Sequence, residues 1–132
     1  MRRPVLADTG PLYAAADPSD LHHQRALSEL ERLARSQREV VVLFPTLLEA
    51  YSLVRRRFDS RVALRWLSEI GSARWVNPAA EDYRKALANV QMYADQKITL
   101  FDATLAVLSV SMGLQVWTYD HHFDVMRVPV WR

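Results

Sequence analysis

The sequence contains no cysteine. Disulfide scaffolds, zinc–thiolate centres and cysteine nucleophiles are therefore excluded. Long apolar runs are also missing. The longest candidates, residues 40–44 and 103–110, fall far short of the roughly 18 residues that a membrane span needs. These absences predict a soluble, cytoplasmic protein with no membrane partner.

Glycine and lysine are both scarce. The three glycines, Gly10, Gly71 and Gly113, form no dinucleotide-binding fingerprint, no phosphate-binding loop and no Gly-x-Ser-x-Gly nucleophile elbow. Only Lys85 and Lys97 are lysines, so the other 15 of the 17 basic residues are arginines, and the net charge is +2. The planar fork of arginine fits phosphate oxygens, although a genome biased toward arginine codons would produce the same composition.

The 132 residues, half of them hydrophobic, fit a single domain spanning residues 1–132. Short apolar or β-branched runs alternate with segments of 3.6-residue periodicity. The expected strands are residues 4–7, 40–44, 75–76, 115–118 and 128–131. The expected helices are residues 13–16, 21–34, 45–57, 60–70, 77–93 and 99–113. This alternation predicts an α/β fold in which helices cover both faces of a mostly parallel sheet.

Finer features of the helices can also be predicted. Ser60 is expected to cap one helix, and the Asn-Pro pair at Asn77 is expected to begin another. Leu21, Leu27 and Leu64 stand at helical spacing from other apolar residues, so we expect them to face the core.

Four acidic residues stand at the ends of expected elements. Asp8 directly follows the first strand, and Asp120 closely follows the strand at residues 115–118. Glu49 and Asp102 lie in the first turns of two expected helices. The carboxyl ends of parallel strands share one edge, where ligands bind, so the four carboxylates can meet there. Their repulsion would be relieved by a hard divalent cation, Mg²⁺ or Mn²⁺, which suits phosphoryl chemistry.

Each acid also has a structural interpretation. Glu49 and Asp102 each stand three residues after a threonine, which is the spacing of a capping box. Asp8 would cap the helix that follows it, and Asp120 would fix a turn. The position of the acids alone leaves both interpretations open.

Four short motifs resemble those of PIN-domain ribonucleases, in the same order along the chain. They are residues 5–9 (VLADT), 46–50 (TLLEA), 100–103 (LFDA) and 118–123 (TYDHHF). Residues 17–23 (DPSDLHH) resemble the loop and helix start that commonly follow the first strand of that family. The resemblance covers essentially the whole chain, whose length and motif order are similar to the VapC-type toxins of toxin–antitoxin modules.

The resemblance implies a PIN-like three-layer α/β/α sandwich with a central sheet of four or five strands. It also implies an endoribonuclease that depends on Mg²⁺ or Mn²⁺ and cleaves RNA phosphodiesters. Members of the family usually form homodimers and are inhibited by a cognate antitoxin protein. RNA, an antitoxin and a second copy of the chain are therefore the expected partners.

The resemblance also assigns roles to individual residues. Asp8 and Asp102 would be the principal metal ligands, and Glu49 and Asp120 would complete the catalytic acidic site. The hydroxyls that would orient carboxylates or water belong to Thr9 and Thr118.

Further candidates lie outside these motifs. Asp95 and Asp124 are possible additional acids of the site, or else solvated residues. The densest basic stretch is a candidate RNA-binding surface, or else an ordinary solvated face; it contains Arg55, Arg56, Arg57 and Arg61. His121 and His122 are adjacent in an expected turn, and neighbouring histidines are not expected to ligate one ion together.

A second class of function remains open at this point. A non-catalytic α/β module could hold a metal or a partner protein without cleaving RNA. A phosphorelay receiver would need paired acids after the first strand and a lysine after the last, and the sequence has neither.

Overall fold

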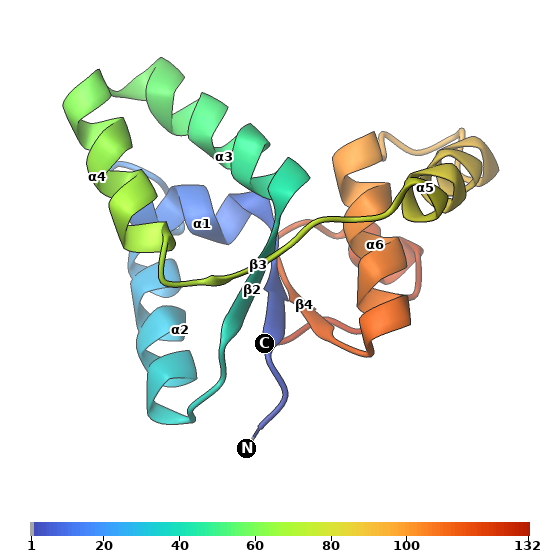
Figure 1. The fold of residues 1–132 in the computed structure, drawn as a ribbon, viewed down its shortest axis with the longest axis horizontal. Helices are drawn as coiled ribbons and strands as arrows, with labels where there is room; N and C mark the ends of the chain where they lie inside the picture. Colours follow the sequence, from blue (N-terminus) through green and yellow to red (C-terminus); the bar gives the residue numbers. More distant parts are fainter. Residues whose placement is uncertain (1) are drawn as a thin grey trace.

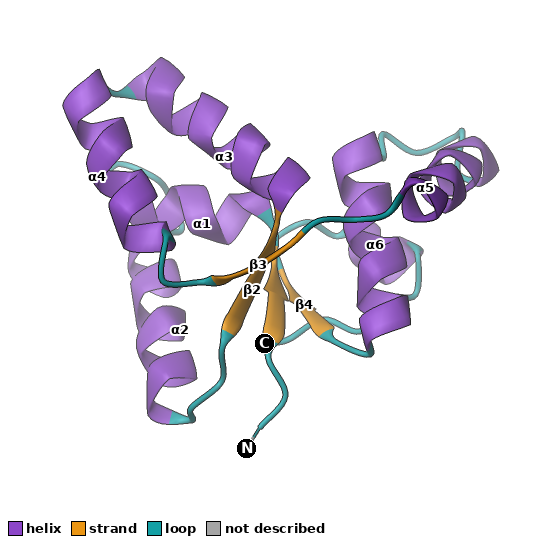
Figure 2. Cartoon of the chain, in the orientation of Figure 1, coloured by secondary structure: helices purple, strands orange, loops and turns teal. Residues whose placement is uncertain are grey.

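The computed structural model describes residues 2–132. Four parallel strands form its sheet in the order β3-β2-β1-β4. They are β1 (Val5–Ala7), β2 (Val40–Leu43), β3 (Arg74–Val76) and β4 (Gln115–Trp117), at the centre of Figure 2. The fifth expected strand, residues 128–131, is reduced to one parallel bridge between Val116 and Val130. The predicted mostly parallel sheet is therefore confirmed with four strands.

The helices form two layers around this sheet, with α1 to α4 on one side and α5 and α6 on the other (Figure 1). Their bounds are α1 (Thr9–Ala16), α2 (His23–Arg35), α3 (Phe44–Arg57), α4 (Ser60–Ile70), α5 (Ala80–Met92), α6 (Leu100–Met112) and α7 (His122–Val125). Each of the helices within residues 2–132 is too short or too polar to cross a bilayer. The predicted α/β/α layering is confirmed.

The central strand β1 shows why the strands read as continuous apolar runs. Its three residues are fully buried. Leu6 packs into the core beneath α5 and α6, whereas Val5 and Ala7 pack into the core beneath α1 to α4. Because successive side chains of a strand point to opposite faces, a strand covered on both faces must be apolar at every position.

Several helix details differ from the sequence-based expectations. Asp59, not Ser60, caps α4, because its Oδ1 accepts a hydrogen bond of 3.0 Å from the Val62 amide. Helix α5 begins at Ala80, three residues after Asn77. Aspartate and serine are both favoured N-cap residues, so the sequence alone does not distinguish Asp59 from its neighbour Ser60.

The expected core positions on α2 and α4 were partly wrong. Leu21 is 91% exposed because α2 begins only at His23, so Leu21 lies in the preceding turn. Leu27 and Leu64 are exposed as well. Helical periodicity identifies an apolar face, but the packing of neighbouring helices decides how wide the buried part of that face is.

Candidate active site

The carboxyl ends of the strands border a hollow of about 520 Å³. The four acids singled out from the sequence all line it. These are Asp8, Glu49, Asp102 and Asp120. The rest of the lining comes from Thr9, Gly10, Lys97, Thr99, Tyr119 and His121. The structure therefore brings together residues that are more than one hundred positions apart in the chain.

Asp8 is the most buried acid of this hollow. It follows β1 and caps α1, with Oδ1 accepting a hydrogen bond from the Thr9 amide at 2.8 Å. Its Oδ2 accepts one from the Thr118 hydroxyl at 2.7 Å. The pKa of Asp8 is raised to about 7; burial is the largest cause, the Asp102 and Glu49 carboxylates act in the same direction, and the two hydrogen bonds oppose the rise. The expected capping role is real, and it coexists with a place in the hollow.

Glu49 is held in a different way from the one its spacing suggests. Helix α3 begins at Phe44, with Leu43 as its N-cap, so Thr46 is not a capping residue and no capping box exists there. Instead, Glu49 accepts a hydrogen bond from the hydroxyl of Thr9. Burial is the main cause that raises the Glu49 pKa, and the Asp102 charge adds to it. The structural interpretation of Glu49 is therefore wrong.

Asp102 combines both of its interpretations. It forms a capping box with Thr99, in which the Asp102 amide donates to the Thr99 hydroxyl at 3.1 Å and Asp102 Oδ2 accepts from the Thr99 amide at 3.2 Å. Burial raises the Asp102 pKa, and the Asp120 carboxylate contributes in the same direction. A carboxylate oxygen has two lone pairs, so one structural hydrogen bond leaves capacity for a further ligand.

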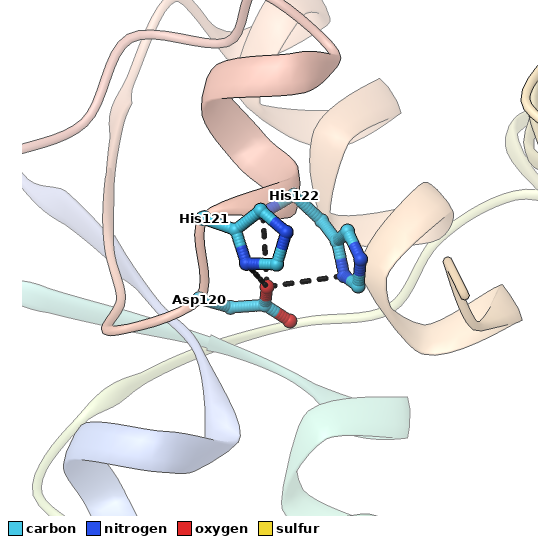
Figure 3. A group of neighbouring side chains, drawn as sticks. All are labelled: Asp120, His121 and His122. Carbon is cyan, nitrogen blue, oxygen red and sulfur yellow. Dashed lines mark hydrogen bonds and ion pairs between the residues drawn. The ribbon is translucent and has the colours of Figure 1, made fainter. Parts of the chain in front are cut away.

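Asp120 lies at the open side of the hollow. Its amide donates to the Thr118 hydroxyl at 3.0 Å, and its Oδ1 accepts from the His122 amide at 2.9 Å. The imidazoles of His121 and His122 both lie beside this carboxylate (Figure 3). The structure thus groups two histidines that the sequence argument had set aside.

The two candidate threonines contact acids of the hollow, whereas the two additional candidate acids lie outside it. Thr9 and Thr118 are buried, and each donates its hydroxyl hydrogen to an acid of the hollow. Asp95 and Asp124 are exposed, and neither lines the hollow. Asp124 pairs with Arg132 at 3.1 Å.

The basic stretch lies mostly away from the hollow. Arg57 stands 3.8 Å from Asp17, at the far end of α3. Arg55 and Arg61 are exposed and do not line the hollow either. Arg56 is better placed, because it lines an adjoining apolar groove together with Glu49.

Lys97 and Tyr119 are among the residues of the hollow that were not predicted from the sequence. Lys97 brings a cation to the hollow, and Tyr119, which stands between Thr118 and Asp120 in the sequence, also lines it. The position of Tyr119 inside the fourth motif was a usable signal. Lys97 lies in the irregular segment before α6, where no periodicity or motif points to it.

The electrostatics of the hollow favour a cation. The pKa values of Asp8, Glu49 and Asp102 are all raised, with burial as the largest cause. In residues 2–132, no ion pair within 4.0 Å involves these three carboxylates. A donor set made of carboxylate oxygens matches the preference of Mg²⁺ or Mn²⁺. The residues present therefore fit a hard divalent ion.

Comparisons with known proteins identify the fold. No protein-family model matches the sequence, and no curated protein matches it either. Among solved structures, the chain is similar to VapC20 of Mycobacterium tuberculosis, a toxin that cleaves the sarcin–ricin loop. The TM-score is 0.83 with 21% identity, over 97% of this chain and 98% of that one.

Two further solved structures are also similar to this chain. VapBC2 from Rickettsia felis, bound to a DNA fragment from its promoter, gives a TM-score of 0.76 at 14% identity, covering 99% of this chain and 98% of that one. FitAcB from Neisseria gonorrhoeae gives 0.70 at 18% identity, covering 97% and 96%. At these identities the similarity establishes the fold alone. The chain has the PIN-domain fold that its motifs predicted.

Proposed function

We propose that this protein is an endoribonuclease that depends on Mg²⁺ or Mn²⁺. The observation that carries the proposal is the cluster of four acids in one hollow, where burial raises the pKa of Asp8 to about 7. A protein does not gain stability by burying carboxylates beside one another without a cation. Such a cluster is characteristic of a site that binds a divalent ion and a phosphate substrate.

The roles of the residues follow from their positions. Asp8 and Asp102, the two most buried acids of the hollow, would hold the ion, with Glu49 and Asp120 completing the oxygen donors. When bound, the ion would lower the pKa of water and stabilise negative charge on the phosphate. Thr9 and Thr118 hold Glu49 and Asp8 in place by donating their hydroxyl hydrogens.

Among the four arginines of the basic stretch, Arg56 is the best placed for an approaching RNA strand. It lines an apolar groove between α3 and α6, and this groove shares Glu49 with the acidic hollow. Seven residues of helix separate Glu49 from Arg56, a distance of about 10 Å along α3. A phosphate bound by Arg56 would therefore lie one or two nucleotides from the hollow. Arg55, Arg57 and Arg61 would contribute only to long-range attraction.

A toxin role is the biological context we propose. The structures similar to this chain include a toxin that cleaves the sarcin–ricin loop, and two assemblies, VapBC2 and FitAcB. By this analogy the chain would act in the cytoplasm as a homodimer, arrest growth by cleaving RNA, and be inhibited by a cognate antitoxin. The exposed apolar side chains of Phe44, Leu48 and Leu100 are available for such protein contacts.

The proposal is tested by mapping new RNA 5′ ends after brief expression in cells. The wild type should generate a few sharp ends that Asp8→Asn does not. Asp124→Asn is the matched control, because it removes an exposed carboxylate outside the hollow and should leave the ends unchanged. Purified protein should cleave an RNA carrying the mapped site, and EDTA should stop the reaction.

The outcomes also separate the alternative function. If wild type and Asp8→Asn are both folded and abundant and neither generates ends, the chain is a non-catalytic binding module. Equal cleavage by Asp8→Asn at the same metal concentration would show that the active site lies elsewhere.

A further inference from the structure

We infer that Asp120, His121 and His122 form a second metal site, which binds Zn²⁺ or a similar ion that prefers imidazole ligands. The site adjoins the acidic hollow and shares the Asp120 carboxylate with it. Apart from Asp120, its ligands differ from those proposed for the nuclease metal, so separate variants can test the two sites.

The geometry of the three side chains supports this site. One ligand atom from each residue can be chosen such that all three lie within 4.8 Å of one another. His122 Nδ1 lies 3.1 Å and His121 Nδ1 lies 3.8 Å from Asp120 Oδ1. In a tetrahedral zinc site with bonds of about 2.0–2.1 Å, neighbouring ligand atoms are about 3.3–3.4 Å apart. Both distances are close to this value, so small side-chain rotations complete the site.

His122 contributes a second and independent observation. Its Nδ1 is buried and makes no hydrogen bond within residues 2–132, even though Asp120 Oδ1 lies only 3.1 Å away (Figure 3). A buried polar atom without a hydrogen bond is costly, and a bound ion is one of the few ordinary explanations for it. A metal ion bound to the ring nitrogen would remove that cost.

The local backbone explains how adjacent histidines can face one ion. His121 lies in the turn before α7 and His122 is the first residue of that short helix. The turn is fixed by the hydrogen bond from the His122 amide to Asp120 Oδ1, and it places the two rings 4.4 Å apart at an angle of 41°. Side chains that would diverge in an extended segment therefore converge on one carboxylate.

The donor set defines which ion is bound. Two imidazoles and one carboxylate suit Zn²⁺ and neighbouring transition metals, whereas Mg²⁺ prefers oxygen ligands. His121 is 76% exposed, so an ion can enter from solvent and retain water at its open coordination position. Mg²⁺ bound in the hollow should therefore leave the two imidazoles available to Zn²⁺.

Binding of Zn²⁺ is tested on the full chain by calorimetry and histidine NMR at neutral pH with saturating Mg²⁺. We expect one Zn²⁺ per chain and perturbed imidazole signals for two of the four histidines, His121 and His122. His121→Ala should weaken binding at least tenfold. His122→Asn should also weaken Zn²⁺ binding. Because His122 is mostly buried, this variant could fail to fold, and the exposed His121 variant then decides the test.

Two controls locate the ion. His22→Gln changes the other adjacent histidine pair and should retain Zn²⁺ binding. Asp8→Asn alters the hollow but not this cluster, and it should retain Zn²⁺ binding as well. The inference is overturned if His121→Ala binds Zn²⁺ as the wild type does, or if Asp8→Asn abolishes binding, because the ion would then lie among the carboxylates of the hollow.

Discussion

Two carboxylates of this protein are almost equally buried, Glu29 at 7% and Asp8 at 8% exposure, but their surroundings differ. Glu29 accepts hydrogen bonds from Trp117 Nε1 at 3.1 Å and from the Tyr119 hydroxyl at 2.5 Å. Arg25 adds a positive charge at 3.4 Å. Burial and the Glu29 carboxylate raise the Tyr119 pKa, so that phenol remains a donor at neutral pH. Glu29 is thus a buried charge with a complete set of partners.

Asp8 has no such set. Its two hydrogen bonds come from neutral donors, Thr9 and Thr118, and its charged neighbours are the carboxylates Asp102 and Glu49. The comparison shows that burial of a carboxylate does not by itself indicate function. What indicates a ligand site is a buried carboxylate whose surroundings repel its charge.

The largest difference between Asp8 and Glu29 should appear in how the stability of the protein depends on pH. The pKa of Asp8 rises from 3.8 when unfolded to about 7 when folded, so its protonated form favours the folded state. Stability from this group is present below pH 4 and is lost as the pH rises to 7, by a total on the order of 4 kcal/mol. Asp8→Asn should lack this loss. Urea unfolding without metal at pH 5 and pH 8 measures it, and parallel curves for the two proteins would contradict the argument.

Addition of a divalent ion should reverse part of that loss. At neutral pH, Mn²⁺ at 100 times its dissociation constant should stabilise the wild type by about 2.7 kcal/mol, because it binds only the folded hollow. Asp8→Asn should gain much less, whereas Asp124→Asn should respond as the wild type does. Thermal unfolding with and without Mn²⁺ provides the measurement, and an equal shift in Asp8→Asn would place the ion elsewhere.

Glu29→Gln should lower the stability of the protein but leave Mn²⁺ binding intact, which is the opposite of what we expect for Asp8→Asn. The amide has one acceptor oxygen in place of two and loses the charge that Arg25 faces, so we expect a stability loss of about 2 kcal/mol. Denaturant unfolding measures this loss, and the Mn²⁺ stabilisation in the same experiment should remain. Loss of Mn²⁺ binding in this variant would mean that Glu29 belongs to the functional site.

The smallest effect is expected at the start of α6. Thr99→Ala removes the hydroxyl that accepts from the Asp102 amide, and it should cost about 1 kcal/mol. Thr99→Ser keeps the hydroxyl and should restore most of that loss in the same unfolding assay. If alanine and serine are equivalent, the capping box does not stabilise α6.

The elements that position the site were largely predictable. The apolar runs at residues 4–7 and 40–44 were predicted as strands, and they contain β1 and β2; Thr99 correctly predicted the start of α6. The order of strands and helices then brought Asp8, Asp102 and Asp120 to one edge. Such features depend on local patterning and on the general rules of parallel sheets.

Other features depended on contacts between distant segments. Glu29 stands on the same face of α2 as Ala26 and Leu33, where a charged residue looks misplaced until Trp117 supplies its donor. Glu49 matched a capping box that does not exist, because α3 begins three residues earlier than that box requires. Spacing describes a helix surface, but it does not say which side chains from other elements meet that surface.

By itself, the sequence determined that strands and helices alternate, that both faces of the sheet are covered, and which acids stand at strand and helix ends. These properties follow from periodicity and from local capping, which act within a few residues. Only the tertiary structure decided that Asp8 is a buried carboxylate among like charges, whereas Glu29 is a satisfied one, and that His121 and His122 converge on Asp120. Desolvation and charge repulsion depend on the three-dimensional distances between groups, and those distances exist only once the chain has folded.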